Sequence, residues 1–228
     1  MSPSSHKVIA IDGPAASGKS STSQWVAEKL GFQHVDSGSL YRALTAALLR
    51  LGAPPERWTP ATMLAQGGRI SLRPAETSFL ALIDGMPAEA EIRGGLVTSH
   101  VSLVARVPEV RAWVNAKVRE AARDHDVVVD GRDMGTAVFP DATLKIFLIA
   151  DPWERARRRL AQRLERSPTD EEIAAETDLL VQRDARDATQ TTQAKDAVVL
   201  DTTYLTQAEQ VERIVALARA VSRRPDDT

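Results

Sequence analysis

The chain has 228 residues, of which 43% are hydrophobic and 26% are charged, so it is long enough for one large domain, or one domain with an insertion, around a sizeable core. Its net charge of −2 gives no electrostatic reason to expect binding to nucleic acid or an anionic membrane, and the absence of cysteine excludes disulfides, thiolate metal sites and cysteine nucleophiles. Because the start of the chain is polar and no segment approaches the ~20 apolar residues that span a bilayer, we expect a cytoplasmic protein without a membrane partner.

The first motif occupies residues 13–20, which read Gly-Pro-Ala-Ala-Ser-Gly-Lys-Ser and match G-x-x-x-x-G-K-[ST]. An apolar run at 7–11 predicts a buried strand before it, and the pattern of 20–30 predicts a helix behind it. This context lets backbone N–H groups surround a polyphosphate, so a chance match in a glycine-bearing turn is the less favoured interpretation. We expect Lys19 to be exposed and to reach the β- and γ-phosphates, and the Ser20 hydroxyl to ligate Mg²⁺.

A second βα unit follows the first. Residues 32–35 are a plausible short strand, and a helical pattern begins at Ser39, a suitable N-cap, and stops at Gly52. The pair Tyr41-Arg42 then lies in the first helical turn, just beyond the end of a strand. Open α/β sheets place ligand contacts at such ends, so this pair is a candidate for ligand binding.

Residues 68–93 differ in character from the units around them. The runs 70–73 and 79–83 predict short strands, and the second leads into a turn at 84–85. Short antiparallel strands between βα units indicate an inserted subdomain instead of a further strand of the main sheet. Helices are expected next at 96–106 and 108–123.

The rest of the chain alternates strands with helices, a pattern typical of a parallel sheet with helices on both faces. The strands are expected at 127–130, 144–149 and 197–201, and the helices at 152–166, 170–186 and 207–222. We expect the tail at 223–228 to be frayed.

The second motif is Asp-Gly-Arg-Asp-Met-Gly-Thr at 130–136, directly after an apolar strand. A phosphate-binding protein needs a carboxylate there to hold Mg²⁺ directly or through water, and Asp130 has that position. Arg132 follows at the strand end and is able to clamp a phosphate with two parallel hydrogen bonds. The alternative is a turn with a surface salt bridge, which the presence of the first motif makes less favoured.

Arginines are concentrated between 155 and 166, and on a helix Arg155, Arg158, Arg159 and Arg163 lie on one side. Taken alone, this pattern favours a solvated face paired with nearby acidic residues. In a phosphoryl-transfer enzyme, arginines of this kind neutralise charge on the transferring group. The four histidines have no spacing suited to a metal site, and we expect no ligand role for them.

Together these motifs closely resemble the bacterial-type cytidylate kinases, a family of the nucleoside monophosphate kinases. The resemblance covers nearly the whole chain, and its most specific segment is 130–136 beside Asp36-Ser37-Gly38 and Tyr41-Arg42. The other segments that carry it are 13–20, Ser102 with 108–111, 138–141, and Arg183-Asp184 with Asp187.

The resemblance implies an α/β P-loop kinase fold with a five-stranded parallel sheet, an inserted monophosphate-binding subdomain and a helical lid. It implies one domain, with a core at 1–38, 124–154 and 195–228, a monophosphate-binding region at 39–123 and a lid at 155–194. The implied reaction is transfer of the ATP γ-phosphoryl group to CMP or dCMP, assisted by Mg²⁺. The expected partners are these small molecules, without nucleic acid, and the expected state is a monomer.

The resemblance also implies a role for individual residues. ATP would contact Gly13, Pro14, Ala15, Ala16, Ser17, Gly18, Lys19, Ser20 and Ser21, and the metal would be held by Ser20 and Asp130, directly or through water. Cytosine would be read by Ser37, Ser102, Arg111 and Asp133, the acceptor phosphate held by Arg42 and Arg132, and the sugar hydroxyls approached by Arg183 and Asp187. The catalytic set would be Lys19, Arg132 and the lid arginines Arg158 and Arg159.

One position departs from the family. Three residues after Asp187 the family usually has an arginine, whereas this chain has Gln190, and Lys195 is a candidate to compensate. Two alternatives to a CMP kinase stay open: a kinase of another small acceptor, and a P-loop binding module such as a GTP switch. No N-K-x-D-type sequence supports the GTP switch.

Overall fold

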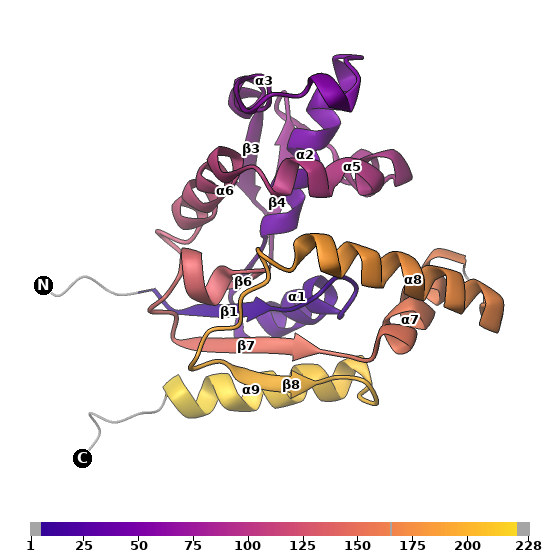
Figure 1. Cartoon of the computed structure of the whole chain (residues 1–228). Coiled ribbons are helices and arrows are strands. Elements are labelled where there is room, and N and C mark those ends of the chain that lie inside the picture. Colours follow the sequence, from indigo (N-terminus) through magenta and orange to yellow (C-terminus); the bar gives the residue numbers. More distant parts are fainter. Residues whose placement is uncertain (1–5, 165, 223–228) are drawn as a thin grey trace, which may run out of the picture.

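The computed structural model describes residues 6–164 and 166–222, so the tail expected to be frayed lies outside the described residues. A five-stranded sheet has the order β2-β6-β1-β7-β8, and each neighbouring pair is parallel (Figure 1). The strands are β1 (Val8–Asp12), β2 (Gln33–Asp36), β6 (Val127–Gly131), β7 (Leu144–Ile149) and β8 (Val198–Asp201). The expected parallel sheet is confirmed.

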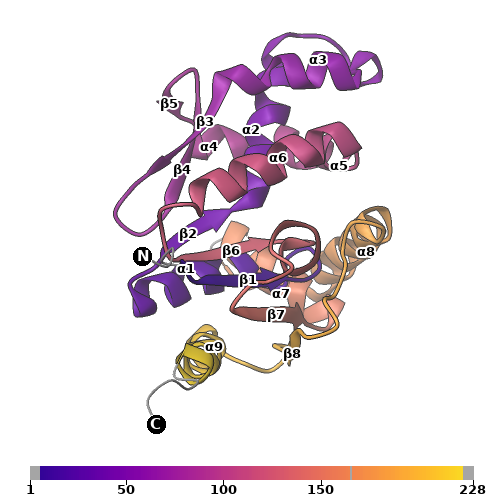
Figure 2. The same ribbon diagram turned by 90° about the vertical axis from the view of Figure 1, so that its left-hand side faces the viewer.

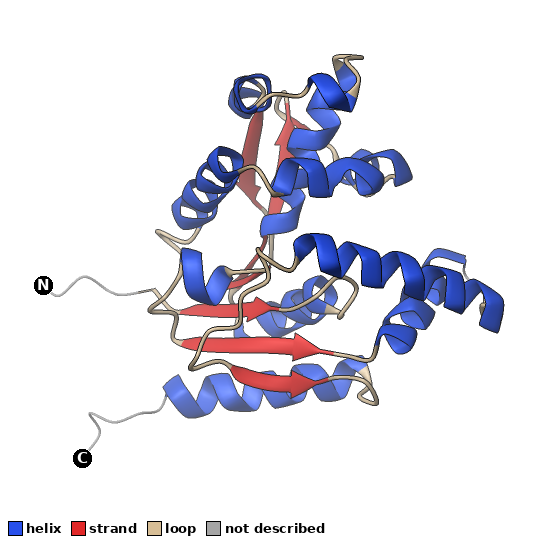
Figure 3. Cartoon of the chain, in the orientation of Figure 1, coloured by secondary structure: helices blue, strands red, loops and turns tan. Residues whose placement is uncertain are grey.

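Helices cover both faces of this sheet, as the alternation of elements predicts (Figure 3). Along β1, Ile9 and Ile11 pack on one face against α1 (Lys19–Leu30) and α9 (Gln207–Ser222). Ala10 packs on the opposite face, in a second apolar cluster with α2 (Ser37–Arg50), α5 (Gly95–Ala105) and α6 (Pro108–Ala121). Because successive side chains of a strand point to opposite faces, one short apolar strand serves both layers.

The insertion forms its own antiparallel sheet, which stands above the main sheet in Figures 1 and 2. Its strands are β3 (Ile70–Pro74), β4 (Phe79–Ile83) and β5 (Met86–Pro87). Asp84 and Gly85 join β4 to β5 with positive φ angles of 53° and 77°, as a two-residue hairpin turn of this kind requires. The predicted turn and the predicted insertion are both confirmed.

Two helices, α7 (Pro152–Leu164) and α8 (Asp170–Asp187), lie at the carboxyl ends of the central strands (Figure 1). A small apolar cluster joins them to each other and to Ala15. The N-terminus of α8 is a capping box, in which the Thr169 hydroxyl accepts from the Glu172 amide and the Glu172 carboxylate accepts from the Thr169 amide. None of the helices in the described ranges is long and apolar enough to cross a membrane.

The sequence prediction differs from the structure in some details. Helix α2 begins at Ser37 with Asp36 as its N-cap, and Ser39 lies inside the helix, where its hydroxyl donates to the Asp36 carbonyl at 2.6 Å. The expectation that Ser39 caps this helix is therefore wrong. Sequence patterns also missed short elements: 3₁₀ turns at Pro55–Arg57 and Gly67–Arg69, α3 (Pro60–Ala65), β5, α4 (Glu89–Ile92) and a π-helical turn at Met134–Val138.

Candidate active site

The loop between β1 and α1 has the backbone that a phosphate-binding loop needs. Gly13 has a φ of 149°, and a Cβ added there would lie 2.3 Å from the Leu148 carbonyl oxygen, so only glycine fits. Gly18 is the N-cap of α1 with a left-handed φ of 88°. The loop amides and the positive end of the α1 dipole consequently lie together at the carboxyl edge of the sheet.

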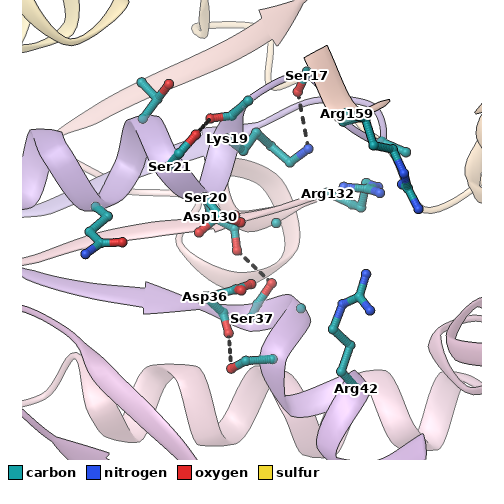
Figure 4. Close-up of a pocket in the computed structure, with 18 of the residues that line it drawn as sticks. Ser17, Lys19, Ser20, Ser21, Asp36, Ser37, Arg42, Asp130, Arg132 and Arg159 are labelled. Carbon is teal, nitrogen blue, oxygen red and sulfur yellow. Dashed lines mark hydrogen bonds between the residues drawn. The ribbon is translucent and has the colours of Figure 1, made fainter. Parts of the chain in front are cut away.

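Lys19 does not lie exposed, as the sequence led us to expect. Its side chain is 6% exposed and folds back under the loop, with Nζ 2.5 Å from the Pro14 carbonyl and 3.3 Å from Ser17 Oγ (Figure 4). Burial, reinforced by the positive charge of Arg132, holds the pKa of Lys19 well below its ordinary value. The expectation of exposure is wrong because the helix start places the side chain inside the curve of its own loop.

Ser20 and Asp130 meet as the two motifs predict. The Ser20 hydroxyl donates to Asp130 Oδ2 at 2.8 Å, which brings a hydroxyl and a carboxylate oxygen together beside the loop. The other carboxylate oxygen contacts His34 Nε2 at 2.7 Å, and both side chains are buried. Burial alone would lower the pKa of His34, but the hydrogen bond and the charge of Asp130 outweigh it and raise the pKa.

The contact of His34 with Asp130 was not predicted from the sequence. The register of the strands would have found it. Parallel pairing of β2 with β6 sets His34 opposite Val128, which is two residues before Asp130 and points to the same face of the sheet. A second missed residue is Asp12, a buried carboxylate at the end of β1. Its two oxygens accept from the Met134 and Gly135 amides, each at 2.8 Å, and so anchor the second motif.

Basic side chains converge next to the phosphate loop, where Arg132 donates to the Gly13 carbonyl at 3.3 Å. Arg42 donates to the Thr98 hydroxyl at 2.9 Å, while Asp187 lies between Arg132, at 3.5 Å, and Arg183, at 3.6 Å. Burial and neighbouring arginines lower the pKa values of Arg42 and Arg183 to about 10. So much positive charge in a half-buried space is the electrostatic setting of an anion site.

The far end of the cavity carries an ion pair between Asp133 and Arg111. The Arg111 guanidinium also lies 5.9 Å from the centre of the Tyr41 ring. Ser37 and Ser102 line the same cavity, and the Ser37 hydroxyl donates to the Asp130 carbonyl at 2.8 Å. A carboxylate, an arginine and hydroxyls thus place both hydrogen-bond acceptors and donors at this end of the cavity.

The arginines of α7 make different contacts. Arg155 is buried and links the Ala15 carbonyl, at 2.8 Å, to Asp184, at 2.6 Å. Arg158 instead donates to the carbonyl oxygens of Thr202 and Thr203, at 2.6 and 2.7 Å. Arg159 lies at the rim of the cavity with Arg132 and Arg42, and the three side chains approach a common space (Figure 4).

A cavity of about 1620 Å³ joins these parts. Of the residues to which the resemblance assigns a role in binding or catalysis, Gly13 and Pro14 do not line it, and all the others do: Ala15, Ala16, Ser17, Gly18, Lys19, Ser20, Ser21, Ser37, Arg42, Ser102, Arg111, Asp130, Arg132, Asp133, Arg158, Arg159, Arg183 and Asp187. Gln190 lines it too, whereas Lys195, the candidate to compensate for the missing arginine, does not.

A phosphate loop at the edge of a five-stranded parallel sheet, facing an arginine-rich second half of one cavity, defines the P-loop kinase class. A gluconokinase from Sinorhizobium meliloti has the same fold, with a TM-score of 0.50, 16% identity and coverage of 96% of this chain and 95% of that one.

This chain belongs to the cytidylate kinase family, whose model matches residues 9–220. It is 42% identical over 214 residues to a cytidylate kinase of Geobacillus kaustophilus, covering 92% of this chain and 95% of the relative. It is 38% identical over 210 residues to that of Limosilactobacillus reuteri, covering 90% and 92%. The resemblance inferred from the motifs is confirmed.

Proposed function

We propose that this protein transfers the γ-phosphoryl group of ATP to CMP or dCMP, forming CDP or dCDP. The observation that supports this most is the cavity itself, which runs from the phosphate loop to the Asp133–Arg111 pair. Its two ends suit two different ligands, a polyphosphate and a polar base, with arginines between them. Membership of the cytidylate kinase family supports the same reaction.

On the donor side, we assign the ATP phosphates to residues 13–21. The loop amides and Lys19 would bind the β- and γ-phosphates once the Lys19 ammonium exchanges its loop carbonyl for phosphate oxygens. Such an exchange suits a desolvated ammonium, since the ligand supplies the negative charge that the buried group lacks.

We assign Mg²⁺ to the site formed by Ser20 and Asp130. Their hydroxyl and carboxylate oxygens are the hard ligands that Mg²⁺ prefers, and their 2.8 Å contact places both donors on one side of the loop. Within the described residues, no cluster of three or more His, Cys, Asp or Glu side chains could hold a metal ion. Two protein oxygens therefore suit an ion that shares its coordination with phosphates and water, where it would neutralise phosphate charge.

On the acceptor side, we assign the phosphate of CMP to Arg42 and Arg132 and the sugar hydroxyls to Arg183 and Asp187. Cytosine presents an N4 amino donor beside N3 and O2 acceptors, so a carboxylate and an arginine form its complement. Asp133 and Arg111 supply that pair, and Ser37 and Ser102 complete the base pocket.

Catalysis requires no general base, because the acceptor is already an ionised phosphate. Lys19, Arg132 and Arg159 face the space between the two halves and would position the reactants and offset the charge that builds up on the transferring group (Figure 4). We assign Arg158 to the same task. Its hydrogen bonds to the Thr202 and Thr203 carbonyls must then open when the site closes.

We further propose that residues 155–194 act as a lid and 39–123 as the monophosphate-binding region of one domain, whose core is formed by 1–38, 124–154 and 195–228. We propose a monomer that works in the cytoplasm on small molecules, without nucleic acid. Light scattering in solution tests the monomer, and a dimeric mass would contradict it.

The test of the function is a screen of acceptors with the wild-type protein, ATP and Mg²⁺. CMP and dCMP should be phosphorylated with the highest kcat/KM, and UMP, AMP and GMP much less well. Transfer to a different acceptor would identify another small-molecule kinase. ATP binding without transfer to any acceptor would identify a binding module, and either result would overturn the proposal.

A further inference from the structure

The buried carboxylate of Glu176 stands where the packing of α8 calls for an apolar side chain. Ile173 and Leu180 of α8 pack against Ala156 and Leu160 of α7. Glu176 is three residues after Ile173 and four before Leu180, so it lies on the same stripe of the helix and is 5% exposed. Because burying a carboxylate costs desolvation free energy that a leucine would not, its presence needs a reason other than packing.

The contacts of Glu176 supply that reason. Its Oε1 lies 2.9 Å from Arg159 Nε, and its Oε2 lies 3.2 Å from Arg163 Nη2. The two arginines are one turn apart on α7, so a single carboxylate on α8 reaches both. Both arginines line the cavity, but Arg163 is more than half exposed, whereas Arg159 is 28% exposed.

The shortest distance of the Arg159 ion pair joins Glu176 Oε1 to Nε, the guanidinium nitrogen nearest the main chain. Figure 4 shows Arg159 directed toward the space that Arg132 and Arg42 also approach. A planar guanidinium that is fixed along one edge presents its remaining donors in a fixed direction, which a lysine could not do.

We propose that Glu176 is a positioning residue for phosphoryl transfer, which orients Arg159 so that its terminal nitrogens face the transferring group. Arg163 neutralises the second carboxylate oxygen and keeps the first engaged with Arg159. Glu176 does not line the cavity, so it acts through Arg159 and not on the nucleotide. This inference rests on the proposed function.

A double-mutant cycle tests the proposal, with wild type, Glu176→Gln, Arg159→Ala and the combined variant assayed at saturating ATP and CMP. Glu176→Gln should lower kcat roughly tenfold, the scale of losses from outer-shell partners, while KM for CMP changes by less than about twofold. On the Arg159→Ala background the same substitution should cost nothing further.

Two more variants separate positioning from a structural role. Glu176→Leu completes the apolar stripe, and the two arginines that it leaves unpaired are 28% and 55% exposed and so keep contact with water. Its thermal midpoint should therefore stay close to that of wild type while kcat still falls. Glu172→Gln is the matched control, because Glu172 also lies on α8 and pairs with an arginine, Arg166, but at the surface. Glutamine at 172 preserves the capping box. Its kcat should stay within about twofold of wild type.

Three results would overturn the positioning role and leave the CMP kinase assignment intact. The first is a rise in kcat for Glu176→Gln, which would mean that Glu176 competes with substrate for Arg159. The second is that Glu176→Gln lowers kcat equally in the wild-type and the Arg159→Ala backgrounds. The third is that Arg159→Ala leaves kcat unchanged. A wild-type protein that transfers to no nucleoside monophosphate would overturn the proposed function and this inference together.

Discussion

The phosphate loop and the α7–α8 pair face the same cavity, but different forces hold them in place. The loop follows β1, whose Ile9, Ala10 and Ile11 are almost fully buried, and its course is fixed by contacts such as that of Gly13 with Leu148. The α7–α8 pair has only a small apolar cluster. Polar contacts add to its attachment, including the hydrogen bond from Arg155 to the Ala15 carbonyl and the ion pair of Asp187 with Arg132.

This difference is what the proposed lid role requires, with the phosphate loop fixed and the α7–α8 pair able to move. Contacts between buried apolar side chains do not depend on the charge of a ligand, so we expect the loop to keep its shape when a polyphosphate binds. The α7–α8 contacts involve groups that a phosphate would also bind: Asp184 accepts from the Ala15 amide at 3.0 Å, within the phosphate loop itself. Ligand binding therefore competes with contacts that hold α7 and α8, which suits the lid role proposed for them.

The largest expected effect is on the loop side. Lys19→Ala should lower kcat roughly 10²–10³-fold, because it removes a charge that the proposed transition state needs. Steady-state kinetics with CMP measure the loss, and circular dichroism checks that the variant is folded. Near wild-type turnover in a folded variant would remove Lys19 from catalysis.

The second effect concerns the pH dependence of core stability. Burial raises the pKa of Asp12 from 3.8 to about 6, so the folded protein holds this proton more tightly than the unfolded chain. Protonation of Asp12 therefore stabilises the folded state. This contribution to the free energy of unfolding, about 3 kcal/mol, is fully present below pH 3.8 and is lost as pH rises through 6.

Asp12→Asn tests this, because asparagine cannot ionise. Between pH 4 and pH 7, the free energy of unfolding of wild type should fall relative to that of the variant, by the order of 3 kcal/mol. Urea unfolding at each pH measures the difference. Asparagine also loses one hydrogen bond to the Met134 or Gly135 amide, but this loss lowers the free energy of unfolding by the same amount at every pH. If the free energies of unfolding of wild type and variant run parallel against pH, the prediction is wrong.

The same contrast separates what the sequence could predict from what it could not. Apolar runs and glycine spacing are local properties, so the sheet strands, the insertion and the phosphate loop followed from the pattern. The direction of Lys19 did not follow, since it depends on how the loop curves over the start of α1. The roles of His34 and Asp12 depend on which strands lie side by side, and that is a tertiary property.

For α7 and α8, sequence reasoning found the arginines but not their partners. Helical spacing placed Arg155, Arg158, Arg159 and Arg163 on one side of a helix. The structure sends them to different groups: a phosphate-loop carbonyl, carbonyls after β8, and Glu176. Long flexible side chains reach several partners from one helix face, so charge spacing alone does not select among them.

The third prediction concerns base selectivity. If Asp133 accepts a hydrogen bond from the cytosine N4 amino group, UMP should be a poor acceptor, because its O4 carbonyl meets the carboxylate acceptor to acceptor. Asp133→Asn can donate toward O4, so the CMP-to-UMP ratio of kcat/KM should narrow by about tenfold, the equivalent of ~1.4 kcal/mol. The ratio is measured by assaying both nucleotides. A ratio that does not change would exclude Asp133 from base recognition.

The smallest effect is expected at the end of α8, where Gln190 stands in place of the arginine usual in the family. Gln190 lines the cavity, and its side-chain amide donates to the Thr189 hydroxyl at 2.5 Å. Gln190→Arg adds a positive charge beside a bound nucleotide at a partly exposed position, so kcat/KM for CMP should rise only a few-fold, roughly the 1 kcal/mol or less of a solvated charge contact.

Lys195→Ala is the matched control for Gln190→Arg. Lys195 does not line the cavity, so its removal should leave kcat/KM for CMP unchanged. A lower kcat/KM in Lys195→Ala would show that Lys195 reaches the nucleotide when α7 and α8 close. It would also explain how the chain tolerates a glutamine at 190. If Gln190→Arg brings no gain and Lys195→Ala brings no loss, the charge supplied by Arg42, Arg132 and Arg183 already suffices for the acceptor.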